Sequence, residues 1–137
     1  MLRPGGRLAV FWNVAVAEPA MADAFAEVYR RIVGDHPFLG RALRPQPGYG
    51  AFNGRANDGI RESGSFEEPE NWTYEWDRVY ARDEWLDVVP TQGGHNTMPP
   101  EQLERVLDGI GAVIDAAGGS LSIHYDVTVA TAVRRAD

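Results

Sequence analysis

The hydrophobic and polar positions along this chain change their spacing several times, and each change predicts a new element. Residues Leu8–Trp12 are apolar on both faces, which is typical of a strand in the interior of a parallel sheet. Glu18 and Pro19 predict the start of a helix, because proline is favoured in the first helical turn, and Gly34 predicts its end. Apolar residues recur at helical spacing between them, at Met21, Phe25, Val28 and Ile32. A strand followed by an amphipathic helix begins an α/β crossover.

The stretch 35–65 has no clear period, and glycine and proline recur throughout it. Loops of this length in a compact domain are usually lids, binding loops or disordered segments. Scattered apolar anchors favour a lid that packs onto the domain and carries a short helical turn. These anchors are Phe38, Leu39, Tyr49, Phe52 and Ile60. We therefore predict a lid-like loop insertion over residues 35–65.

Regular patterns return in the second half of the chain. Alternating aromatic and polar residues predict a strand over Trp72–Tyr80, and a short helix is expected from about Asp83. A longer helix should begin at Pro99 and Pro100 and end at Gly118 and Gly119. Its apolar stripe is Leu103, Val106, Leu107, Ile110, Val113 and Ile114. Strict alternation then predicts a long final strand around Ser120–Arg134, and we expect Trp72, Trp76 and Trp85 to pack in a core or under the lid.

Composition narrows the class of protein. The chain has 137 residues, 44% of them hydrophobic and 24% charged, which favours one globular domain over residues 1–137. A net charge of −7 argues against a nucleic-acid partner. There is no cysteine, no apolar run approaching the ~20 residues of a membrane span, and no pattern of a signal peptide at the start. We expect a cytoplasmic protein without disulfides and without a membrane partner.

Three stretches resemble one enzyme family. LRPGGRLAVFWN resembles the entry into the fifth strand of class I S-adenosylmethionine-dependent methyltransferases, where a Leu-Arg/Lys-Pro-Gly-Gly turn is characteristic. WTYEWDRVYARDEWLDVVPTQGGHNTMPPEQL and IDAAGGSLSIHYDVTVATAVRR resemble the last two strands of the small-molecule, type 11 branch. The resemblance covers nearly the whole chain and is vaguest over 35–65. It implies an α/β fold with part of a Rossmann-like sheet. The final strand would insert antiparallel between the opening strand and the strand near 72–80, with flanking helices.

The same resemblance implies that S-adenosylmethionine is held by other residues. The family binds this cofactor on a glycine-rich loop after its first strand and an acidic residue ending its second, and neither segment is present in this sequence. The stretch PGGRL is no substitute, because it precedes a strand, whereas a nucleotide-cradling loop follows a strand and opens a helix. We therefore expect the truncated, carboxy-terminal half of a methyltransferase, inactive unless the amino-terminal half is supplied.

Four residues are candidates for binding the methyl acceptor. Asn13 is expected just past the end of the opening strand, where ligands gather in open α/β sheets, and the alternative is an asparagine that caps a loop. Trp12 beside it either faces the same cavity or packs in the core. Tyr29 belongs to the expected substrate-side wall. His95 lies in a glycine-flanked loop and is a weak candidate for a general base, with structural packing as the alternative.

Metal binding is not expected, because the three histidines share no short ligand spacing. The leading hypothesis is a portion of a methyltransferase that supplies the substrate-side wall. The alternative is a non-catalytic association module, in which the bare edge of the opening strand pairs with a second copy or with a separate amino-terminal half. A third hypothesis is a binding protein for a small apolar ligand, with a pocket formed by Trp72, Trp76 and Tyr49.

Overall fold

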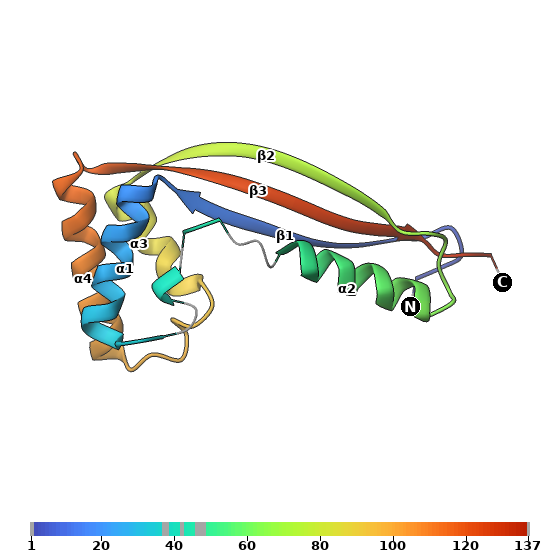
Figure 1. Cartoon of the computed structure of the whole chain (residues 1–137), viewed down its shortest axis with the longest axis horizontal. Coiled ribbons are helices and arrows are strands. Elements are labelled where there is room, and N and C mark those ends of the chain that lie inside the picture. Colours follow the sequence, from blue (N-terminus) through green and yellow to red (C-terminus); the bar gives the residue numbers. More distant parts are fainter. Residues whose placement is uncertain (1, 37–38, 42, 46–48, 137) are drawn as a thin grey trace. The chain divides into compact units, whose positions relative to one another are not determined.

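The computed structural model describes residues 2–36, 39–41, 43–45 and 49–136, and for residues 49 and 50 the backbone alone. The expected anchors Phe38 and Tyr49 thus have side chains outside the described part. The elements along the chain are β1 (Arg7–Ala17), α1 (Pro19–Val33), a 3-10 turn (Leu39–Arg41), α2 (Tyr49–Glu62), β2 (Glu70–Ala81), α3 (Arg82–Val88), a 3-10 turn (Val89–Thr91), α4 (Pro100–Ala116) and β3 (Ser120–Val133) (Figure 1).

The three strands form one open sheet in the order β1-β3-β2. The backbone of Arg134 exchanges hydrogen bonds with Gly5 and Gly6 ahead of β1, and a bridge between Phe66 and Arg134 is antiparallel. The predicted insertion of the final strand between the other two is confirmed, and the protein is an α/β protein with a three-stranded antiparallel sheet. Among the described residues β1 has β3 as its only neighbour, so the parallel neighbours expected beside Leu8–Trp12 are not among them.

The Pro-Gly-Gly turn that enters β1 is explained by its backbone. The Gly6 N–H donates to the Arg3 carbonyl at 2.8 Å. Gly5 has φ of +75°, which suits the third position of a type II turn with Pro4 before it. A Cβ on Gly6 would lie 2.8 Å from the Arg3 carbonyl oxygen. Both glycines are therefore required by the turn itself.

Two compact units divide the chain, and the expectation of a single domain over 1–137 stays a prediction. One unit comprises residues 1–14, 45–76 and 125–137, and the other comprises residues 15–44 and 77–124. Each strand contributes residues to both units. We call them the α2 unit and the helical unit, and describe each by itself.

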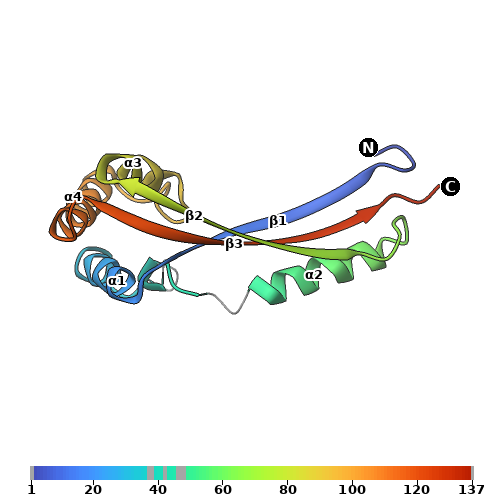
Figure 2. The same ribbon diagram turned by 90° about the horizontal axis from the view of Figure 1, so that it is seen from above.

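In the α2 unit, the structure replaces much of the predicted loop 35–65 with α2, a helix of 14 residues (Figures 1 and 2). Asn53, Ala56, Asn57 and Ile60 are the more buried residues of α2, and their spacing places them on one face. The helix was missed because two of these four positions are asparagine and because Gly50, Gly54 and Gly59 lie within it.

In the helical unit, the predicted apolar stripe forms the core. Val106, Ile110 and Ile114 of α4 are fully buried, and α4 packs against α1 and α3 (Figure 2). The predicted helix ends are confirmed, since Gly34 follows α1 with φ of +79° and Gly118 and Gly119 follow α4 with positive φ. No helix in the described ranges is both long and apolar enough to cross a bilayer.

The expectation for the tryptophans holds for Trp85 alone. Trp85 is 1% exposed in the helical unit, where its ring meets Tyr80 edge-on. Trp72 and Trp76 on β2 are 37% and 40% exposed, so they are not core residues. The alternation that suggested a buried face instead produces a strand with nearly all of its residues exposed.

Candidate functional site

Tyr29 and His95 form a buried polar pair in the helical unit. Tyr29 lies on the core face of α1, and His95 lies in the turn that follows the second 3-10 segment. The Tyr29 hydroxyl and His95 Nε2 are 2.8 Å apart, and the two side chains are 2% and 1% exposed. Gly94, with φ of +91°, brings this turn against Leu39. The structure therefore joins two of the four predicted site residues.

The hydrogen bonds of His95 fix its neutral tautomer. Nδ1 lies 3.2 Å from the Gln92 carbonyl oxygen, which can only accept, so Nδ1 carries the proton. Nε2 then accepts the Tyr29 O–H. Burial lowers the pKa of His95, and burial raises the pKa of the Tyr29 phenol well above its usual range. Both groups are neutral near pH 7.

This pairing limits the chemistry of His95. Both ring nitrogens are used within the chain, so His95 cannot take a proton from a ligand while the Tyr29 bond is intact. A general-base role would require the Tyr29 hydroxyl to relay the proton or to turn away. As the bonds stand, the pair connects α1 with the turn that follows Thr91.

Trp12 and Asn13 belong to the α2 unit and point to opposite faces of β1, as neighbours in a strand do. The Trp12 ring stacks on Phe52 of α2 at a centroid distance of 6.0 Å. Asn13 Oδ1 accepts the Trp76 indole N–H at 3.3 Å. The expectation that Asn13 follows the end of the strand is wrong, because β1 continues to Ala17. The two residues are thus not brought to one site.

The face of the sheet that carries Asn13 is aromatic in the α2 unit. Trp76 stacks on Tyr125 at 4.1 Å, and the Arg7 guanidinium lies 5.4 Å from the centre of the Trp72 ring. Phe11 on the same side of β1 is 66% exposed. The exposure of Trp72 and Trp76 does not fit the enclosed pocket of the third hypothesis, and the Tyr49 side chain that it also needs lies outside the described part.

A pocket of about 650 Å³ lies in the helical unit, and the sequence analysis did not predict it. Its described lining includes three arginines and three carboxylates: Arg30, Arg41, Arg44, Asp23, Glu27 and Asp35. Arg30 pairs with Glu27, and Arg44 pairs with Asp23 at 2.5 Å. The formal charges of these six residues therefore balance. The sequence did not indicate this pocket, because charged residues on the outer side of an amphipathic helix are the same as those of an ordinary exposed surface.

The described residues do not fit S-adenosylmethionine. A nucleotide cradle needs a glycine-rich loop between a strand and the helix that follows it. Here β1 leads to α1 through Glu18 alone, and β2 leads directly into α3. Neither junction has a glycine, so neither can form such a cradle.

Comparison with known proteins found no family model that matches the sequence and no similar curated protein. Evidence on function therefore comes from the residues and the fold of the chain itself. It consists of the strand order, the hydrogen bond between Tyr29 and His95, and the stacking of Trp12 on Phe52.

Proposed function

We propose that these residues are the carboxy-terminal, substrate-side portion of a small-molecule methyltransferase that uses S-adenosylmethionine. The observation that carries this proposal is the strand order β1-β3-β2, in which the last strand of the chain lies antiparallel between the other two. In the resembling family the same order follows a Pro-Gly-Gly turn, and here that turn is Arg3–Gly6. Among the described residues no strand lies on the side of β1 away from β3, which supports the proposal because a larger sheet would continue there.

In this proposal the chain binds and orients the methyl acceptor, and cofactor binding belongs to residues outside it. In the α2 unit, Trp12 offers a flat apolar surface and Asn13 offers an amide. In the helical unit, Tyr29 and His95 hold the turn after Thr91 against α1. Methyl transfer to an oxygen, nitrogen or carbon nucleophile depends chiefly on alignment, which such residues can provide without a base.

Calorimetric titration of the 137-residue chain with S-adenosylmethionine tests whether cofactor binding requires residues outside the chain. We expect no binding heat at cofactor concentrations up to the ~1 mM that bounds typical enzyme affinities, because neither strand–helix junction has a glycine-rich loop. Circular dichroism of the same sample serves as the control that the chain is folded. Binding with a micromolar Kd would contradict the proposal.

A further inference from the structure

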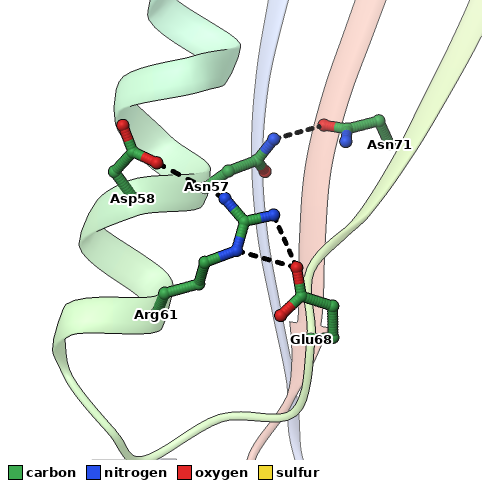
Figure 3. Close-up of polar contacts among 5 residues, drawn as sticks. All are labelled: Asn57, Asp58, Arg61, Glu68 and Asn71. Carbon is green, nitrogen blue, oxygen red and sulfur yellow. Dashed lines mark hydrogen bonds and ion pairs between the residues drawn. The ribbon is translucent and has the colours of Figure 1, made fainter.

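The contact of α2 with the sheet of its own unit is largely polar. Asn53 Nδ2 donates to Asn71 Oδ1 at 3.0 Å and to Thr128 Oγ1 at 2.8 Å. Asn57 Nδ2 donates to the same Asn71 oxygen at 3.1 Å, as Figure 3 shows. Two asparagines of the helix thus converge on one side-chain oxygen of β2.

This polar contact leaves two acceptors unsatisfied. The Oδ1 atoms of Asn53 and Asn57 are buried and accept no hydrogen bond from the described residues. Most buried polar atoms in native structures make a hydrogen bond, because removing a polar atom from water without a partner costs free energy. Docking of α2 therefore has two built-in penalties that act only while the helix lies on the sheet.

The remaining contacts of α2 are few and mostly exposed. Ile60 is its one buried residue within the described part, and Phe52 stacks on Trp12 while staying 44% exposed. Near the end of the helix, Arg61 pairs with Asp58 and Glu68 (Figure 3). These ionic groups are about half exposed or more, and such pairs add little stability. By contrast, three residues of α4 are fully buried.

The sequence of α2 also disfavours a free helix. Three glycines and two asparagines occupy 5 of its 14 positions, at Gly50, Asn53, Gly54, Asn57 and Gly59. Glycine and asparagine are weak helix formers, and isolated helices of this length are marginal even with alanine-rich sequences. Once away from the sheet, α2 should therefore lose its helical structure as well.

We propose that α2 is a detachable lid that leaves the sheet and unfolds while β1, β3 and β2 stay paired. Detachment removes Phe52 from Trp12 and uncovers the face of the sheet that carries Asn71 and Thr128. The lid is a property of the fold and needs neither the cofactor nor the acceptor of the proposed function. It assigns a lid role to α2, which is part of the stretch 35–65 for which the sequence predicted a lid-like loop.

Hydrogen exchange of the unmodified chain tests the lid. Amides of α2 should exchange at least about 100-fold faster than the middle amides of β3. Their rates should also rise less steeply with denaturant concentration than those of β3, because detaching one helix exposes less surface than unfolding the whole chain. The proposal is overturned if the α2 amides exchange at the rate of the β3 amides and with the same denaturant dependence.

An apolar replacement in the polar contact gives a second test. Asn57→Leu removes one unsatisfied acceptor, and Asn71 Oδ1 keeps the hydrogen bond from Asn53. We expect α2 protection to rise about tenfold with β3 unchanged. Arg55→Leu introduces the same side chain at an exposed position of α2 and should leave protection unchanged. Equal or lower protection in Asn57→Leu would count against the lid, and the measurement on the unmodified chain stands whether or not this variant folds.

Discussion

Replacing His95 with leucine is expected to lower the free energy of unfolding by about 2–4 kcal/mol. His95 is almost fully buried and uses both ring nitrogens, one toward Tyr29 and one toward the Gln92 carbonyl. Leucine fills a similar volume but leaves the Tyr29 hydroxyl buried without a partner. Urea denaturation followed by circular dichroism measures the change, which is a large part of the total stability of a small domain.

Two further variants distinguish the contribution of the Tyr29–His95 hydrogen bond to stability from the effect of replacing any histidine with leucine. His124→Leu removes an exposed hydrogen bond to Asp77 and should change stability by no more than about 1 kcal/mol. Tyr29→Phe should cost about 1–2 kcal/mol alone, and much less in a chain that already carries His95→Leu, because the partner nitrogen is gone. Equal costs in both backgrounds would contradict the hydrogen bond as the source of the stability.

The penalty of His95→Leu should also depend on pH. Burial lowers the pKa of folded His95 below the value of 6.5 expected in the unfolded chain, so the unfolded state binds more protons between the two values. The stability from neutral His95 is therefore complete above pH 6.5 and is lost as the pH falls toward the folded pKa. We expect the penalty to be smaller at pH 5 than at pH 7. A penalty that is constant or grows at pH 5 would contradict a buried neutral imidazole.

The second large effect is expected at the contact between α1 and α4. A Cβ on Gly109 would lie 2.7 Å from Cγ1 of Val28, a branched side chain that is itself buried. Overpacking of this kind costs about 1–3 kcal/mol, and the gain in helix propensity from glycine to alanine returns at most about 1 kcal/mol. Gly109→Ala should therefore destabilise the protein by about 1–2 kcal/mol in thermal or urea denaturation.

Gly111 provides the matched control in the same helix. A Cβ there would lie 2.6 Å from Nη2 of Arg82, the far end of a flexible and partly exposed side chain that can move aside. The ion pairs of Arg82 with Asp83 and Asp115 are exposed and contribute little. Gly111→Ala should thus be neutral or slightly stabilising. If Gly109→Ala is equally well tolerated, the close approach of the two helices is not a constraint.

The elements best predicted from the sequence are those determined by residues close together along the chain. The apolar residues of α4 recur at helical spacing, and Val106, Ile110 and Ile114 are all fully buried. Glycines placed after the predicted helices have the positive φ angles that make them effective helix ends. The place of β3 in the sheet came from the family resemblance, since alternation alone predicts a strand without its neighbours.

Features that depend on distant residues were not predictable. The asparagines on α2 look like loop residues until Asn71 and Thr128, far away in the sequence, lie opposite them. His95 was selected for its glycine-flanked loop, but nothing in the sequence indicates Tyr29 as its partner, 66 residues away. Trp12 and Asn13 were grouped because they are adjacent, yet adjacency in a strand places them on opposite faces.

The most direct test of the proposed function is the binding of S-adenosylhomocysteine to a longer polypeptide. This polypeptide would carry these 137 residues together with any segment encoded in frame before them, and its folding would be checked by circular dichroism. The account predicts that it binds with a Kd on the order of micromolar, as methyl-transfer enzymes with ordinary KM values require. A folded polypeptide of this kind that gives no binding signal would contradict the account.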